Sequence, residues 1–174
     1  MVYSPSSGEE VGRCGESTTN RHEDGYSVFA GSHQLTIDDK GRLAVPARFR
    51  HALDQTCGAQ LVLTMGYESC LELYPVPEFR TICESIESME NREHAELLKR
   101  AFVGRAVECE LDKQGRIGVP PLLRRQAGLG SAVVLVGQIN RFELWAEEKW
   151  AAMYGEGPDS ILPTLKDAFR ALKR

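Results

Sequence analysis

The sequence lacks the patterns on which metal binding, disulfide bonding and membrane insertion depend. Its five cysteines are scattered without a CxxC pair, and its four histidines show no HxxxH or HExxH spacing. Structural zinc sites need such closely spaced ligands, so we assign no metal and no cofactor. We expect the cysteines to be reduced and mostly buried. No run of eighteen apolar residues occurs, so no transmembrane helix is expected.

Motifs of the common catalytic sites are also missing. The chain contains no GxSxG, P-loop, GxGxxG or His–Cys constellation. Asp38 and Asp112 occupy matching positions and raise the alternative of a carboxylate dyad, which needs two acids about 3 Å apart sharing one proton. The Lys and Arg residues beside both acids favour ionised carboxylates and argue against such a dyad. We therefore expect that the protein is not an enzyme.

Excess positive charge is absent, since 21 Lys and Arg face 25 Asp and Glu, a net charge of −4. Nucleic-acid-binding proteins are often basic overall, but binding depends on where the charge lies. Residues 1–27 are acidic and rich in Ser, Gly and Glu, so we expect a disordered extension without a secretory signal, in a cytoplasmic protein. The abrupt change at Val28 supports the hypothesis that translation starts near that residue. An intact native mass covering all 174 residues would contradict it.

One nine-residue phrase is present twice. DDKGRLAVP at 38–46 returns as DKQGRIGVP at 112–120, an offset of 74 residues. A second match, at an offset of 71, aligns ELY (72–74) with ELW (143–145) and also aligns Gly66 with Gly137. A repeat sustained this far predicts two copies of one β-rich unit, packed pseudo-symmetrically.

Each copy has the pattern of a strand, a Gly turn, a strand, a short helix and a second hairpin. Apolar spacing predicts a helical hairpin within 77–90 and 92–104, with Gly104 ending its second helix. An amphipathic C-terminal pattern predicts a last helix docked on its own subunit or on a neighbour. The expected organisation is an extension (1–27), a first unit (28–77), a helical connector (78–104), a second unit (105–150) and a helical tail (151–174).

The DxxGR pattern within the repeated phrase is typical of a tight turn. Gly41 and Gly115 supply a backbone conformation with positive φ. Asp38 and Asp112 can accept hydrogen bonds from turn amides or pair with the arginine four residues later. We assign these four residues to shaping the loop. On this evidence alone, a plain β-turn with an internal ion pair remains an open interpretation.

Basic residues gather around both copies of the turn. They are Lys40, Arg42, Arg48 and Arg50 in the first half, and Lys113, Arg116, Arg124 and Arg125 in the second. Arginine binds phosphate or guanine bidentately, and lysine contacts phosphate as a point charge. A β-ribbon can enter the major groove of DNA. The pattern therefore favours double-stranded DNA as the partner.

Four segments, at 31–50, 70–79, 104–129 and 133–150, resemble the MraZ family, whose members contain two tandem SpoVT–AbrB units. The resemblance implies an α+β fold with two pseudo-symmetric AbrB-like β-hairpin units forming a barrel-like core, a helical hairpin between them and a C-terminal helix. It also implies ring-shaped homo-oligomers and a nucleoid-associated transcription regulator. Such regulators bind promoter direct repeats upstream of the division and cell-wall gene cluster, typically as autoregulatory repressors.

The resemblance further implies that the repeated turns contact DNA. The expected DNA-binding residues are Lys40, Arg42, Lys113 and Arg116, with the basic neighbours Arg48 and Arg50. If only one turn per subunit faces DNA, we expect the first, where the lysine stands beside the glycine. The alternative is an AbrB-like protein-interaction module of antitoxin type. Such antitoxins usually carry one unit and a disordered C-terminal tail.

Overall fold

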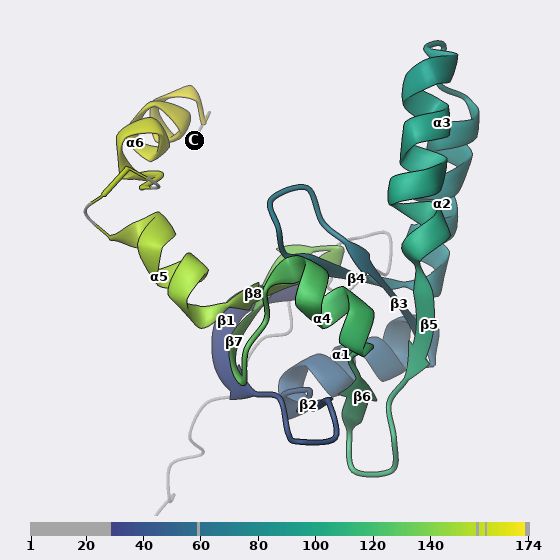
Figure 1. Cartoon of the computed structure of the whole chain (residues 1–174), viewed down its shortest axis with the longest axis vertical. Coiled ribbons are helices and arrows are strands. Elements are labelled where there is room, and N and C mark those ends of the chain that lie inside the picture. The colour runs from purple at the N-terminus through teal and green to yellow at the C-terminus, as the bar shows by residue number, and fades with distance from the viewer. Residues whose placement is uncertain (1–28, 59, 156, 159, 173–174) are drawn as a thin grey trace, which may run out of the picture.

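The computed structural model describes residues 29–58, 60–155, 157–158 and 160–172 (Figure 1). The expected N-terminal extension and the proposed start near residue 28 lie outside this part of the chain. The first half contains β1 (Phe29–Thr36), β2 (Arg42–Ala44), α1 (Ala47–Cys57), β3 (Gln60–Met65), β4 (Leu71–Pro75), α2 (Val76–Glu87) and α3 (Arg92–Ala101). The second contains η1 (Val103–Arg105), β5 (Val107–Glu110), β6 (Arg116–Gly118), α4 (Pro121–Ala127), β7 (Ala132–Ile139), β8 (Arg141–Ala146), α5 (Glu147–Tyr154) and α6 (Leu162–Ala171).

The strands form an antiparallel sheet in the order β1-β7-β8-β4-β3-β5 and a separate two-stranded ribbon of β2 and β6. The α+β class is confirmed. The barrel-like core is not closed within the described residues, because β1 and β5 remain as the two edges of the sheet.

The two halves exchange strands, which corrects the expectation of a separate first hairpin in each unit. In the described part of the chain, the one β-bridge between the β1 and β2 segments joins Ile37, directly after β1, to Leu43 of β2. Otherwise β1 pairs with β7, β5 pairs with β3, and β2 pairs with β6, each across the two halves. Alternation of apolar and polar residues marks a strand but does not identify its partner, so the sequence pattern suggested local hairpins instead.

The pairing registers reveal a pseudo-two-fold relation between the halves. In the ribbon Leu43 lies opposite Ile117, its equivalent at the offset of 74. In the large sheet Glu72 lies opposite Glu143, its equivalent at the offset of 71. The axis relating the halves therefore passes between the members of each pair.

The proposed match of Gly66 with Gly137 is wrong. Leu63 pairs with Leu73 in the first half and Leu135 with Leu144 in the second, so the offset in β3 and β7 is 72. Gly66 begins the turn after β3, whereas Gly137 lies within β7. A Cβ atom on Gly137 would meet the neighbouring β1 backbone at 2.7 Å, which accounts for glycine there.

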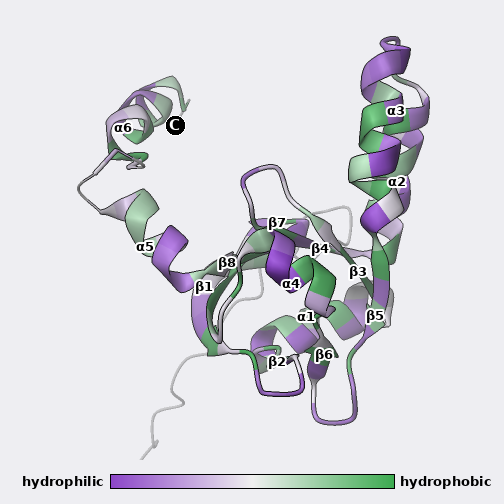
Figure 2. Ribbon diagram, in the orientation of Figure 1, coloured by the Kyte–Doolittle hydropathy of each residue, from purple (hydrophilic) through white to green (hydrophobic). Residues whose placement is uncertain are grey.

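Apolar side chains from both halves fill one core between the sheet, the ribbon and helices α1 and α4. Leu43 and Ile117 of the ribbon are fully buried in it. Phe49 of α1 stacks edge-on against Phe142 of β8 at 4.8 Å between ring centres. Figure 2 shows that hydrophilic residues instead follow the turn between β5 and β6. Among the cysteines whose side chains the structure describes, Cys70 is buried, Cys83 and Cys109 are partly buried, and all three are free.

Helices α2 and α3 form the expected hairpin, which projects from the sheet (Figure 1). The side chain of Asn91 caps α3 by accepting a hydrogen bond from the backbone of His94 at 3.0 Å. Gly104 does not end this helix, which corrects the sequence expectation. The helix stops at Ala101, and Gly104 lies in the following 3₁₀ turn. Phe102 stacks on Phe79 at that point, directly before the 3₁₀ turn that leads to β5.

The last helix, α6, stands apart from the sheet (Figure 1), so docking on its own subunit is not seen. Leu162, Phe169 and Leu172 are exposed on or beside it. None of the helices in the described part of the chain is both long and apolar enough to cross a membrane.

Candidate nucleic-acid interface

The two DxxGR turns lie at one end of the molecule, away from the projecting helices α2 and α3 (Figure 1). The turn at 38–41 leads into β2, and the turn at 112–115 leads into β6. Because these strands pair with each other, the ribbon brings together two segments that are 74 residues apart.

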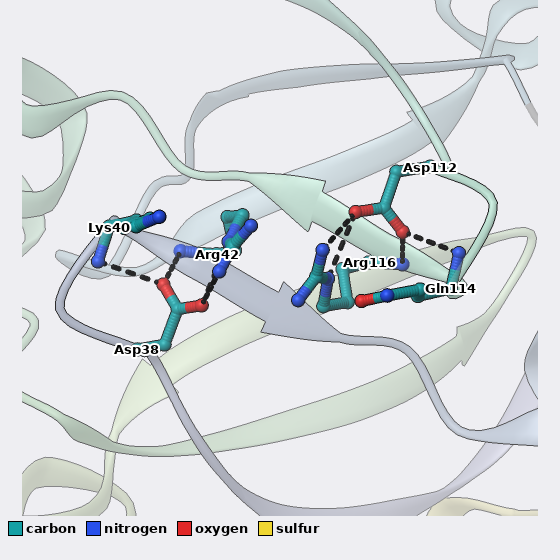
Figure 3. A network of polar contacts seen from close by, with 6 residues as sticks. All are labelled: Asp38, Lys40, Arg42, Asp112, Gln114 and Arg116. Atoms are coloured by element: carbon teal, nitrogen blue, oxygen red, sulfur yellow. Dashed lines mark hydrogen bonds and ion pairs between the residues drawn. The ribbon is translucent and has the colours of Figure 1, made fainter.

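Asp38 binds its own turn through both carboxylate oxygens (Figure 3). Its Oδ1 accepts hydrogen bonds from the backbone N–H groups of Lys40 at 3.0 Å and Arg42 at 2.8 Å. Its Oδ2 accepts from Arg42 Nε at 2.8 Å and lies 2.7 Å from Nη2. The turn closes with a 2.8 Å bond from Gly41 N–H to the Asp38 carbonyl, and Gly41 has a φ of +77°.

Asp112 repeats this arrangement in the second half (Figure 3). Its Oδ1 accepts from the backbone of Gln114 at 2.8 Å and of Arg116 at 3.0 Å. Its Oδ2 accepts from Arg116 Nε at 2.9 Å and Nη2 at 2.8 Å. Gly115 closes the turn with a φ of +73°. The same four-point brace therefore holds both turns.

Hydrogen bonds from the arginines stabilise both carboxylates in the ionised form. The side chain and backbone of Arg116 lower the pKa of Asp112 to about 2, and those of Arg42 lower the pKa of Asp38. A carboxylate dyad requires one acid to stay protonated near the other. Here each carboxylate is bound to the arginine of its own turn, which is the opposite arrangement.

Each turn also contacts the other half of the molecule. The Gly41 carbonyl accepts a hydrogen bond from Val119 N–H at 2.8 Å, and the Gly115 carbonyl accepts one from Val45 N–H at 2.9 Å. A Cβ atom on Gly115 would collide with the side chain of Arg50, which lies across that turn. The turns are thus fixed by both halves together.

Arg50 and Arg124 are equivalents at the 74-residue offset, and each packs against the turn of the opposite half. A Cβ atom on Gly41 would lie 3.2 Å from Arg124 Nη1. The Nε atoms of both arginines are buried and have no hydrogen-bond partner among the described residues. The sequence placed Arg50 in the DNA-binding set but omitted Arg124. The same offset, applied to Arg50, would have identified its counterpart.

The remaining predicted DNA-binding residues differ in how exposed they are and in whether a carboxylate pairs with them. Lys40 and Lys113 are exposed and have no carboxylate partner in the described part of the chain. Arg42 and Arg116 keep 34% and 25% of their side-chain surface exposed, although each is paired with its aspartate. Arg48 is exposed on α1, and its guanidinium lies near Gly31 of β1 rather than over a turn. The structure therefore gathers two lysines and two arginines at the ribbon.

Comparison with known proteins gives a consistent result for both halves. A family model described as "MraZ protein", antitoxin-like, matches residues 28–101 and 102–165. The "Transcriptional regulator MraZ" of Thioalkalivibrio sulfidiphilus (strain HL-EbGR7) is 48% identical over 124 residues, covering 71% of this chain and 83% of the relative. The protein of the same name from Alcanivorax borkumensis is 44% identical over 138 residues, covering 78% and 94%.

Proposed function

The chain belongs to the MraZ family, and from that membership and the geometry of the ribbon we propose that it is a DNA-binding transcriptional regulator and not an enzyme. The relatives' shared name, transcriptional regulator, supports the regulatory role. The observation that carries the DNA-binding role is the pair of aspartate-braced turns, which present basic side chains at one end of the molecule.

The hydrogen bonds from each aspartate give the lysines and the arginines different roles in DNA binding. Each aspartate engages Nε and Nη2 of its arginine, which leaves Nη1 as the donor for a phosphate or a base edge. The aspartate also cancels most of that arginine's charge. Lys40 and Lys113 therefore supply the attraction to the phosphate backbone, while Arg42 and Arg116 position the contact. Arg48 adds a peripheral phosphate contact, and Arg50 supports the turn that it covers.

We propose that assembly strengthens these contacts. One subunit offers few free bases, but a ring of identical subunits repeats them on a shared surface and gains avidity on repeated DNA. Direct repeats about 10 base pairs apart would present the same DNA face to successive subunits. The exposed apolar residues of α6 support contact with a neighbouring subunit. Light scattering of the intact protein tests this assembly, and a monomeric mass would contradict it.

The finer proposal concerns the target. The family resemblance implies direct repeats upstream of the division and cell-wall gene cluster, and autoregulatory repression by a cytoplasmic, nucleoid-associated protein. A reporter fused to the upstream DNA tests it. Deletion of the gene should raise reporter expression, and lowered or unchanged expression would contradict repression.

A gel shift with DNA from upstream of the protein's own gene tests the assignment of the arginines. Arg42→Ala and Arg116→Ala should each weaken binding by about 1–3 kcal/mol, with Arg42→Ala the more damaging. Arg80→Ala provides the matched control, because Arg80 is exposed on α2, outside the ribbon. Failure of the wild type to retard the DNA, or wild-type binding by both ribbon variants, would refute the proposal.

A protein-interaction module of antitoxin type is the second candidate. The antitoxin-like description of the family model and the exposed apolar side chains of α6 favour it. It predicts a protein partner whose capture depends on Phe169 and is unchanged by Arg42→Ala. The gel shift separates the two candidates, since only DNA binding through the ribbon requires both arginines.

A further inference from the structure

A hollow of about 350 Å³ lies on the face of the sheet opposite the ribbon. It is bounded by the turn between β3 and β4, by β8 and by α5. Side chains alternate between the faces of a strand, so Leu144 enters the core on the ribbon side while Glu143 and Trp145 line the hollow. The hollow is therefore separate from the proposed DNA-binding surface.

Two glutamates face each other at the base of this hollow. Glu72 and Glu143 are direct cross-strand partners on the pseudo-two-fold axis, an arrangement in which like charges repel. Among the described lining residues, only Arg141 has a basic side chain. Its Nε lies 3.7 Å from Glu72 Oε1, and its Nη2 lies 3.4 Å from Glu143 Oε1. Glu68 adds a third acid from the turn. Acids thus outnumber bases by three to one in the lining.

The hydrogen bonding at the base of the hollow is incomplete. Tyr74 Oη donates to Glu72 Oε2 at 2.5 Å, and Trp145 Nε1 donates to Glu143 Oε2 at 3.0 Å. Glu72 is only 8% exposed, yet its Oε1 accepts no hydrogen bond from the described residues. Arg141 Nε is buried and has no hydrogen-bond partner either. Glu72 Oε1 therefore keeps its capacity for a further donor.

Aromatic side chains form the walls of the hollow. Trp145 and Trp150 lie 6.1 Å apart between ring centres, and Tyr154 follows Trp150 at 4.9 Å. Tyr67 completes the lining from the exposed turn. Aromatic faces attract organic cations, and carboxylates supply the opposite charge and the acceptors.

We propose that this hollow binds a small organic ammonium cation. The aromatic walls contact the alkyl part and the charge, and Glu72 and Glu143 accept hydrogen bonds from the ammonium group. Arginine between the glutamates limits their repulsion while the site is empty. The hollow's size falls within the range of small-molecule sites.

Intrinsic fluorescence tests the proposal directly, because both tryptophans of the chain line the hollow. The intact protein is titrated with tetramethylammonium chloride and, separately, with 1,5-diaminopentane hydrochloride. Sodium chloride at matched ionic strength is the reference. We expect a saturable change with 1,5-diaminopentane, whose ammonium groups carry N–H donors, a weaker change with tetramethylammonium, which has none, and no change with sodium. Absence of a saturable change with 1,5-diaminopentane would overturn the proposal.

Three glutamine variants locate the binding. Glu143→Gln keeps an acceptor for Trp145 but removes a charge, and should weaken binding about tenfold. Glu68→Gln removes a charge from the exposed turn and should weaken binding measurably even if Glu143→Gln folds poorly. Glu84→Gln, exposed on α2, should bind as the wild type does. Equal affinity in all three would overturn the site. A fluorescence change that appears on raising the protein concentration without either cation would also overturn the proposal. It would indicate that a lysine from a second copy of the chain occupies the hollow.

Discussion

At the scale of single residues, Asp38 and Asp112 matter because they fix the orientation of an arginine that would otherwise be mobile. Each uses one oxygen for two turn amides and the other for the guanidinium. The arginine is therefore oriented for contact with DNA, but the paired aspartate offsets much of its positive charge. The unpaired lysine of each turn then provides the charge that a phosphate contact requires.

The left-handed conformation of Gly115 leads us to expect that a substitution there destabilises the fold. Gly115→Ala should destabilise the fold by about 1–2 kcal/mol from the left-handed backbone alone, and further through contact with Arg50. Urea unfolding measures the change. Gly118→Ala in the same half is the control, since a Cβ atom there meets nothing within 4 Å. Equal unfolding free energies for the two variants would show that the turn is not constrained as described.

The lowered pKa of Asp112 makes a second prediction. The Asp112 carboxyl has an ordinary pKa of 3.8 and a pKa of about 2 in the folded protein. Its contribution to the free energy of unfolding is therefore complete above about pH 4. That contribution is lost as the pH falls towards about 2. Asp112→Asn should therefore be less stable than wild type at pH 6, with the difference shrinking between about pH 4 and 2.

Unfolding midpoints of the wild type and Asp112→Asn over that pH range check this result. Asp39→Asn removes the same charge from an exposed neighbour of the other turn. The side chain of Asp39 makes no hydrogen bond or ion pair with the described residues. A stability gap between wild type and Asp112→Asn that does not change with pH would contradict the bond pattern of the turn.

At the scale of elements, the exchange of strands between the halves explains why the turns come together. The helix patterns at 77–90 and 92–104 and the glycine turns were predictable, because they depend on local spacing and on the backbone freedom of glycine. The partners of β1 and β2 were not, since they depend on contacts between distant segments. The roles of Arg50 and Arg124 follow from that pairing, so the sequence identified their charge but not their position.

The exchange predicts that one half cannot fold alone. A fragment of residues 29–101 lacks the partners of β1, β2 and the outer edge of β3, so it should show no cooperative urea unfolding by circular dichroism. Mixing it with a fragment of 102–172 should restore cooperative unfolding. Cooperative unfolding of the first fragment as a monomer would contradict the interlocked arrangement.

At the scale of the whole molecule, overall charge gives a misleading indication of function. The net charge is −4, yet the ribbon end gathers Lys40, Lys113 and two braced arginines. Asp38, Asp39 and Asp112 share the turns with these bases, and further acidic residues lie on the projecting helices and around the hollow. The sequence repeat could predict two basic turns, but only the fold shows that they share one end of the molecule.

The central claim is that the two turns together form the DNA-binding surface. The salt dependence of binding, measured by fluorescence anisotropy with the upstream DNA, tests it most directly. Each lost phosphate contact should reduce the slope of log K against log salt by about 0.9. The double variant Lys40→Ala/Lys113→Ala should therefore flatten the slope by about 2 per engaged subunit, while the control Arg80→Ala/Arg100→Ala, on the projecting helices, keeps it. An unchanged, wild-type slope for Lys40→Ala/Lys113→Ala would contradict the claim that both turns contact DNA, and so would an equal flattening in the control variant.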